Sequence, residues 1–208
     1  AEVNLLFALD PARGREEALS LGLGTEREIA AQCVMAEKNL NCVTTTSAGR
    51  LFDAVSALLG IRRTSTFEGE AAVYLEEAAA KVTVRPIVPP PLRFDGAGFF
   101  HLPTRAIFER LAAARRKGAD PSQLSAEFHA LLAASVAAGC AAAREATGIS
   151  TVALSGGVFQ NRLLLSLVTK GLVAEGFTVL RHPLIPPNDG GIALGQAVHA
   201  LCRFMMEG

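Results

Sequence analysis

The last third of the chain alternates between short apolar runs and longer segments with apolar residues at helical spacing. This alternation predicts a strand over 150–155, a helix over 159–175, a strand over 177–182 and a helix over 190–205. Two strands joined through a helix pair in parallel, because the crossover returns the chain to the same end of the sheet. The sequence therefore predicts a βαβα unit and an α/β fold class.

The rest of the chain is predicted to be mostly helical. Thr25 and Glu28 form a capping-box pattern that begins a helix running to about residue 40. Residues 83–102 predict a short hairpin on a sheet edge, because their prolines would disrupt a central strand. The turn of this hairpin is predicted at Asp95-Gly96. The first 24 residues predict no long element. Four further helices are predicted over about 49–59, 71–81, 103–118 and 121–147.

Gly156 and Gly157 lie between the first predicted strand and the helix that follows it. Glycines at such a turn leave backbone N–H groups accessible to an anion, and the helix N-terminus adds a favourable dipole. The alternative is a tight turn with close packing of the helix on the strand, and the two glycines taken alone favour it.

A second glycine pair, Gly190-Gly191, follows the second predicted strand in the segment PPNDGG. Either Asn188 or Asp189 is predicted to cap the next helix. Asp189 has a second interpretation, as a carboxylate at the mouth of a cleft where it ligates a metal ion. Both glycine pairs follow the carboxyl ends of predicted parallel strands, where open α/β sheets bind ligands. This placement favours the binding interpretation.

A third candidate patch lies at the start of the helix predicted over 49–59. Ser47, Gly49 and Arg50 are residue types that contact phosphate or carbonyl oxygens, and Asp53 follows within one helical turn. A capped helix with a solvated aspartate explains the same residues, and the sequence does not decide between the two interpretations.

Composition narrows the classes of function. Half of the 208 residues are hydrophobic, which is enough to bury a substantial core. Twenty basic and twenty acidic residues cancel, so electrostatic binding to nucleic acid is not indicated. An uncharged stretch rich in small residues, 130–143, is too short to span a bilayer. We therefore predict a soluble cytoplasmic protein with neither nucleic-acid nor membrane partners.

The cysteines and histidines show no metal-binding spacing. The four cysteines lie far apart without a CxxC pair, so they are predicted to be reduced core thiols. The four histidines share no close spacing and are predicted to be core or surface residues rather than ligands. No GxSxG, Walker A or GxGxxG motif occurs.

Four segments, taken together, are more specific. They are TSAGRLFDAVSALLGI (46–61), TFEGEAAVYLE (66–76), VALSGGVFQNRLLL (152–165) and PPNDGGIALGQA (186–197). In this order and spacing they resemble the C-terminal region of the hydrogenase maturation carbamoyltransferase HypF. The resemblance runs from about Cys42 to the end, except for a divergent stretch at 83–105. More distantly, the chain is similar to the tRNA threonylcarbamoyltransferase TsaD and to antibiotic O-carbamoyltransferases.

The resemblance implies an actin/Hsp70/sugar-kinase-like (ASKHA) lobe, with a small mixed sheet flanked by many helices. Residues 42–208 would form the C-terminal lobe of the carbamoyltransferase domain. Residues 1–41 would be an N-terminal helical segment that continues from an upstream lobe absent here.

The resemblance also implies an activity, cofactors and partners. HypF-like enzymes use ATP and carbamoyl phosphate, and an upstream YrdC-like domain makes carbamoyl-adenylate. The domain to which this lobe belongs passes the carbamoyl group to the C-terminal cysteine thiol of HypE. HypE then dehydrates the product to a thiocyanate, the source of cyanide ligands for [NiFe] hydrogenase.

Site residues follow from the matching motifs. Asp53 matches a position that binds ribose hydroxyls, and Gly69 would lie against the nucleoside, although a glycine doublet usual in TsaD is single here. Asp189 would be one ligand of a divalent iron or zinc ion. The remaining implied contacts with nucleotide, phosphate or carbamoyl are Gly156, Gly157, Asn161, Ser47, Gly49 and Arg50.

The chain also departs from the family pattern. The two histidine metal ligands of the other lobe, the acylphosphatase domain and the YrdC-like domain are missing, so the isolated chain is predicted to be inactive. No residue is assigned as a general base. Two alternatives remain: a non-catalytic nucleotide-binding or protein-interaction module of the same fold, and a sugar-kinase or actin-like ATPase lobe. The segments QNRLL and PPNDGG argue against the kinase or ATPase alternative.

Overall fold

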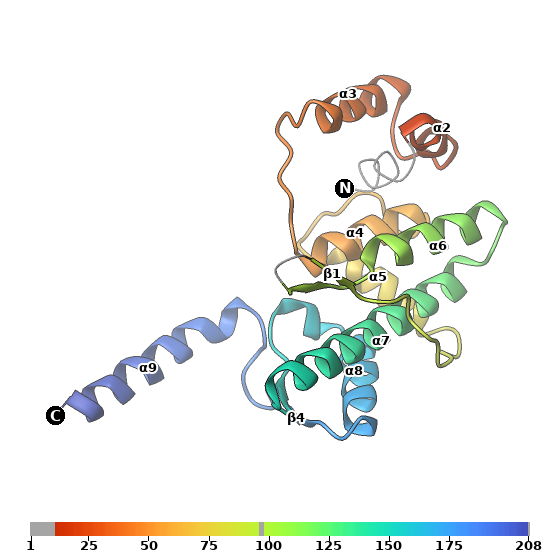
Figure 1. The fold of residues 1–208 in the computed structure, drawn as a ribbon. Coiled ribbons are helices and arrows are strands. Elements are labelled where there is room, and N and C mark those ends of the chain that lie inside the picture. The colour runs from red at the N-terminus through yellow and green to blue at the C-terminus, as the bar shows by residue number, and fades with distance from the viewer. Residues whose placement is uncertain (1–10, 96–97, 208) are drawn as a thin grey trace.

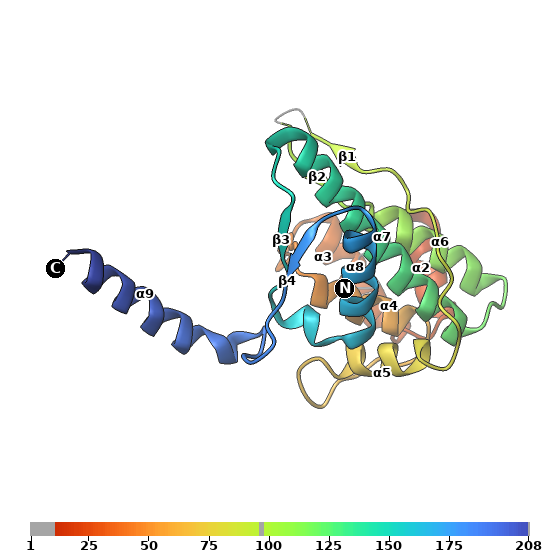
Figure 2. The same ribbon diagram turned by 90° about the horizontal axis from the view of Figure 1, so that it is seen from below.

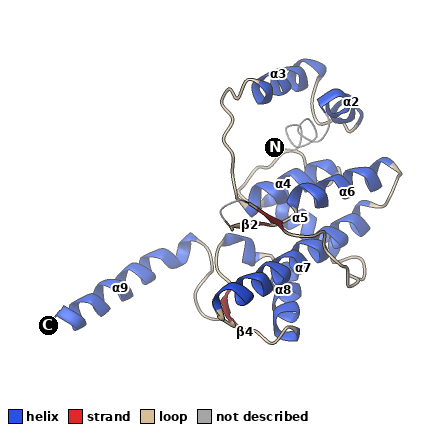
Figure 3. Cartoon of the chain, viewed as in Figure 1, coloured by secondary structure: helices blue, strands red, loops and turns tan. Residues whose placement is uncertain are grey.

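The structure is a computed structural model that describes residues 11–95 and 98–207. Helices dominate it (Figure 3). The α-helices are α2 (Pro11–Ser20), α3 (Glu26–Glu37), α4 (Ala48–Leu58), α5 (Glu70–Ala79), α6 (Thr104–Arg116), α7 (Pro121–Thr147), α8 (Arg162–Ala174) and α9 (Ile192–Glu207). The other elements are strands β1 (Arg93–Phe94), β2 (Phe100–His101), β3 (Thr151–Ala153) and β4 (Thr178–Leu180), and 3-10 turns η1 (Gly157–Gln160) and η2 (Asp189–Gly191).

The predicted βαβα unit is confirmed. Strands β3 and β4 pair in parallel, with Val152 opposite Val179, and α8 connects them. On α8, Leu164, Val168 and Leu172 are buried at a spacing of four residues, so one face of the helix packs into the core. The helix begins later than predicted, at residue 162, because η1 fills the space between the glycine turn and α8.

Helix α7 is the central element of the core. Its predicted start is confirmed, since the Asp120 side chain accepts hydrogen bonds from the Ser122 and Gln123 N–H groups at 3.0 Å. Gly148 ends the helix in a left-handed conformation with φ 73°. Helix α8 crosses α7 and packs against it, and α5 and α6 also pack against α7 (Figures 1 and 2). The largest fully buried side chains include Phe52, Phe108, Phe128, Leu131 and Leu172.

By length and composition alone, α7 is apolar enough to cross a membrane. In the structure, half of its most apolar stretch is buried against neighbouring elements. The core helix of a globular lobe has the same composition, so this helix gives only weak support for a membrane span.

The predicted hairpin forms, but not on the edge of the β3–β4 sheet. Strands β1 and β2 make an antiparallel sheet of their own, so the predicted mixed sheet is two separate pairs. Phe100 rests against Gly139 of α7, where an added Cβ would lie 2.8 Å from the ring. The hairpin therefore belongs to the surface of α7. Asp95 of the predicted turn is described, whereas Gly96 lies outside the described residues.

The N-terminal region holds a helix, α2, that the pattern of its first 24 residues did not predict. Within α2, Ala18 is fully buried and Glu17 forms an ion pair with Arg116 of α6 at 2.9 Å. The ion pair joins residues far apart in the sequence, so a local sequence pattern cannot predict it. The first ten residues of the predicted segment 1–41 lie outside the described residues, and its boundary at residue 42 stays a prediction.

The predicted capping box of α3 is confirmed, because Thr25 and Glu28 exchange both of its hydrogen bonds. The helix ends at Glu37 rather than near residue 40, since Asn39 adopts a left-handed φ of 51°.

The cysteine prediction is partly wrong. All four are free thiols and Cys33 is buried, but Cys202 is exposed on α9. Helix α9 extends away from the rest of the molecule in both views (Figures 1 and 2). Each described side chain over 192–206 is exposed.

Candidate functional site

A cleft of about 690 Å³ lies where α4, α5 and the two glycine turns meet. Four segments far apart in the sequence line it, drawn from 47–53, 68–76, 157–161 and 188–189. The three patches that the sequence singled out separately therefore share one site. Its volume lies within the range of about 300–1,000 Å³ that small-molecule sites occupy.

Almost all of the predicted site residues line this cleft. The exception is Gly156, which lines a neighbouring pocket. The predicted residues in the cleft are Ser47, Gly49, Arg50, Asp53, Gly69, Gly157, Asn161 and Asp189. Their proximity is a finding, whereas their roles as ligand contacts stay predictions.

The first wall of the cleft is the N-terminal turn of α4. Ser47 is the N-cap residue, yet within the described chain its hydroxyl makes no capping hydrogen bond. Arg50 and Asp53 form an ion pair at 2.9 Å, one helical turn apart. This arrangement places a hydroxyl, a guanidinium and a carboxylate on one rim, and the helix N-terminus adds a partial positive charge.

The second wall is the start of α5, where glycine is required by the backbone. Gly69 is the N-cap residue with φ 80°, in the left-handed region, and an added Cβ would meet nothing within 4 Å. The next residue, Glu70, is buried, accepts a hydrogen bond from the Thr66 N–H group and pairs with Arg62. The Thr66 hydrogen bond lowers the pKa of Glu70 below its usual value. This buried anchor was missed, because in the sequence it looks like a solvated glutamate.

The two glycine turns are joined to each other. The Gly156 N–H group donates to the Pro187 carbonyl oxygen at 2.8 Å. Gly156 adopts φ 102° and ψ 157°, and an added Cβ would have open space around it. Backbone conformation, and not close packing of a helix, therefore requires glycine at this position.

Asn161 lies at the floor of the cleft and is buried. As the N-cap of α8, its Oδ1 accepts a hydrogen bond from the Leu164 N–H group at 2.8 Å. Its Nδ2 lies 3.0 Å from Nε2 of His129 on α7. His129 is buried, one of the two placements predicted for the histidines, but its contact with a cleft residue was not foreseen, because the two are 32 positions apart.

Several other polar residues of the cleft were missed as well. Glu68, Glu76 and Gln160 also line it. Glu76 accepts a hydrogen bond from the Leu163 N–H group at 2.9 Å, which ties α5 to the first turn of α8. The acid-rich sequence of α5 gives no sign of which carboxylate faces the cleft.

Asp189 reaches the cleft from η2. The capping residue of this turn is Asn188, whose side chain accepts from the Gly190 N–H group at 3.1 Å, so Asp189 is not used as the cap. Over residues 11–95 and 98–207, no three His, Cys, Asp or Glu side chains are grouped to hold a metal ion. A single carboxylate supplies too few ligands, so these residues do not by themselves form a metal site.

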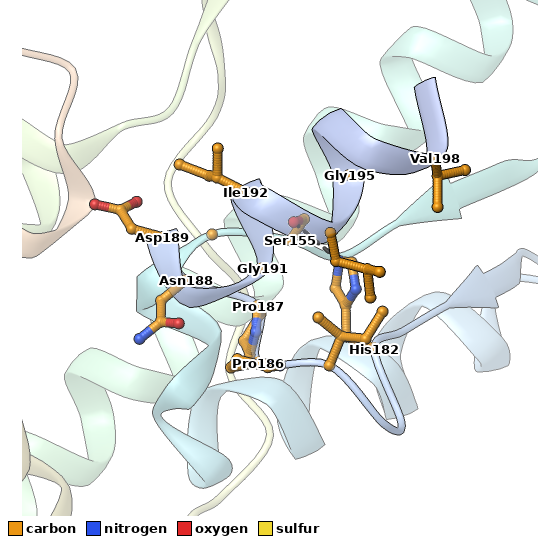
Figure 4. A pocket seen from close by; sticks show the side chains of 13 residues that line it. Ser155, His182, Pro186, Pro187, Asn188, Asp189, Gly191, Ile192, Gly195 and Val198 are labelled. Atoms are coloured by element: carbon orange, nitrogen blue, oxygen red, sulfur yellow. Dashed lines mark hydrogen bonds between the residues drawn. The ribbon is translucent and has the colours of Figure 1, made fainter. Parts of the chain in front are cut away.

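A second pocket, of about 480 Å³, lies beyond the glycine turns (Figure 4). Ser155 and His182 face each other there, with Ser155 Oγ 3.0 Å from His182 Nε2. Ser155 follows the carboxyl end of β3, His182 follows that of β4, and both residues are exposed. Apolar side chains such as Ile192 and Val198 form much of the remaining wall.

The fold and the cleft define a class of protein. The family model described as the second subdomain of the carbamoyltransferase Kae1-like domain matches residues 3–196. This match confirms the predicted ASKHA-type lobe.

Relatives narrow the class to one family. The chain is 38% identical to the carbamoyltransferase HypF of Rhodobacter capsulatus, over 96% of this chain and 25% of that protein. It is 35% identical to a carbamoyltransferase HypF homolog of Cupriavidus necator, over 88% of this chain and 47% of that protein. The chain thus spans about a quarter of the length of the Rhodobacter relative.

Solved structures agree with this placement. A crystal structure of full-length HypF in a phosphate- and nucleotide-bound form matches 99% of this chain and 26% of its own, with a TM-score of 0.83 and 30% identity. HypF of T. kodakarensis matches 82% of this chain and 21% of its own, with a TM-score of 0.70 and 27% identity. The chain belongs to the HypF carbamoyltransferase family.

Proposed function

We propose that this chain is the nucleotide-binding C-terminal lobe of a HypF-type carbamoyltransferase. The full protein would transfer a carbamoyl group from carbamoyl-adenylate to the C-terminal cysteine thiol of HypE, for synthesis of the cyanide ligands of [NiFe] hydrogenase. The observation that carries the proposal is the convergence of three sequence patches on one cleft. The nucleotide in the crystal structure of a full-length HypF relative supports it.

The cleft offers suitable chemistry for an adenylate. Asp53 is a carboxylate suited to ribose hydroxyls, and Asn161 offers an amide to the nucleoside. Arg50, together with the N-terminal turns of α4 and η1, supplies positive charge and backbone N–H groups of the kind that bind phosphate. In the reaction, the thiolate sulfur attacks the carbamoyl carbon, a C–S bond forms, and the C–O bond to the phosphate breaks to release AMP.

The transfer would need parts from beyond this chain. The proposed partners are the upstream lobe, the YrdC-like domain and HypE. A divalent iron or zinc ion would take Asp189 as one ligand and its other ligands from the upstream lobe. Because these parts lie outside the 208 residues, we expect the isolated chain to bind nucleotide without carbamoyl transfer.

Calorimetric titration of the chain with ATP, ADP and AMP tests the proposal. We expect weak binding of at least one of the three, reduced about tenfold or more in Asp53→Ala and in Asn161→Ala, which corresponds to about 1.4 kcal/mol. Glu145→Ala is the matched control, because Glu145 is an exposed carboxylate of α7 that does not line the cleft. Equal affinity in all variants would place the nucleotide outside the cleft, and no binding to the unmodified chain would favour a protein-interaction module of the same fold.

A further inference from the structure

A chain of hydrogen bonds runs beneath the cleft from α7 to α8. His129 Nδ1 lies 2.8 Å from the Ser125 carbonyl oxygen, and His129 Nε2 lies 3.0 Å from Asn161 Nδ2. Asn161 Oδ1 accepts from the Leu164 N–H group at 2.8 Å. His129 is fully buried, and Asn161 is 8% exposed.

Backbone groups at the two ends determine which atom donates and which accepts in each of these hydrogen bonds. The Leu164 N–H group can only donate, so the atom of Asn161 that faces it is the oxygen. The amide nitrogen therefore faces His129 and donates to Nε2, which must carry a lone pair. The proton of the neutral imidazole is then on Nδ1, where it meets the Ser125 carbonyl oxygen, a group that can only accept.

The surroundings keep the imidazole neutral. The rings of Phe52 and Phe128 approach His129 edge-on, with centroids 5.5 and 5.6 Å away. Burial lowers the pKa of His129 from 6.5 to about 4, because the charged form loses its hydration. Nε2 is thus available as an acceptor at neutral pH.

We propose that His129 is a positioning residue that holds Asn161 as a hydrogen-bond donor to the cleft. Asn161 Nδ2 carries a second hydrogen, and among the described residues His129 is the one hydrogen-bond partner of this nitrogen. This hydrogen is the one that Asn161 offers to a ligand, whereas its oxygen is already used by Leu164. The cleft therefore selects a nucleotide that presents an acceptor atom here, such as an unprotonated ring nitrogen or a ribose or phosphate oxygen. This inference rests on the proposed function.

The tautomer is tested first on the unmodified chain, by nitrogen-15 NMR of the histidine side chains at neutral pH. We expect His129 to be neutral, with the proton on Nδ1 and Nε2 unprotonated. A charged ring, or a proton on Nε2, would overturn the inference. This measurement needs no ligand, so it is independent of whether the cleft binds nucleotide.

Two substitutions then distinguish a positioning role of His129 from a role in packing alone. His129→Gln keeps a side-chain acceptor that can reach Asn161, whereas His129→Leu removes the acceptor and keeps an apolar side chain. We expect the affinity for AMP to stay within about threefold of the unmodified chain in His129→Gln and to fall about tenfold or more in His129→Leu. A role in packing alone predicts the same affinity in both variants, and that result would overturn the inference.

A third variant covers the case in which His129→Leu does not fold. Asn161→Asp replaces the donor with an oxygen that faces His129 Nε2, so His129 must take up a proton to stay paired. We expect a charged His129 by NMR at neutral pH and a loss of AMP affinity of about tenfold or more. A neutral His129 with unchanged affinity contradicts the inference. Absence of binding of ATP, ADP and AMP to the unmodified chain would instead overturn the proposed function, and with it the ligand contact inferred for Asn161.

Discussion

Gly156 is the residue at which backbone geometry constrains the site most tightly. Its φ of 102° and ψ of 157° fall in a region that is essentially restricted to glycine. Its N–H group also holds the Pro187 carbonyl oxygen, so strain here would pass from one glycine turn to the other. We expect Gly156→Ala to lower the free energy of unfolding by about 1–3 kcal/mol, measured by urea unfolding.

Gly157 provides the matched control for this prediction. It begins η1 without a positive φ, and an added Cβ would be an ordinary 3.8 Å from Asn188 Cβ. Gly157→Ala should therefore cost much less stability than Gly156→Ala. Equal losses in the two variants would show that the conformation at position 156 is not what requires glycine.

At the residue level, the sequence predicted which residues line the site better than it predicted the contacts that those residues make. The family resemblance was enough to select Asp53, Gly69 and Asn161, which the structure places around one cleft. It did not show that Asn161 is held by His129, or that Glu70 is a buried anchor. Both contacts depend on how α7 and the loop before α5 are placed, and a local sequence pattern carries no information about that placement.

At the level of elements, exposure distinguishes α9 from the core helices. Over 192–206 its side chains are exposed, so the helix buries little apolar surface. We expect a chain ended after Gly195 to unfold with a free energy within about 1 kcal/mol of the unmodified chain. In contrast, Leu172→Ala on α8 removes a fully buried side chain and should cost about 2–5 kcal/mol.

Thermal and urea unfolding of both variants check this contrast. A loss on truncation as large as that of Leu172→Ala would mean that α9 packs against the lobe in solution. Because Leu172 lies away from the cleft lining, nucleotide affinity at temperatures where the variant stays folded should be unchanged.

Local signals decided which elements were predictable. The predicted bounds of α7 agree with the structure, in which Asp120 caps its start and Gly148 ends it. Helix α2 was missed because its stabilising ion pair joins Glu17 to Arg116, 99 positions away. The placement of the hairpin on α7 was also missed, since its strands are two residues long and contact across the fold fixes them.

At the level of the whole molecule, the cleft has the volume and polar lining of a small-molecule site, but within the described residues it lacks a full set of metal ligands. Its lining includes several charged and polar side chains, yet the described residues offer Asp189 without a second and third ligand beside it. Under the proposed function, the missing ligands would come from the upstream lobe of the full protein. We therefore expect a nucleotide to stabilise the isolated chain against unfolding and a metal ion alone to leave its stability unchanged.

Thermal unfolding measures this difference directly. A nucleotide at about 100 times its Kd stabilises the native state by about 2.7 kcal/mol, which should raise the Tm by about 5–10 °C for a chain of this size. Ferrous or zinc ion alone should leave the Tm within about 1 °C, because one carboxylate binds such an ion too weakly to stabilise the fold. A metal-dependent rise in Tm that disappears in Asp189→Ala would contradict this expectation and would show that the lobe holds a metal without its neighbour. A rise with nucleotide that persists in both Asp53→Ala and Asn161→Ala would place the nucleotide outside the cleft.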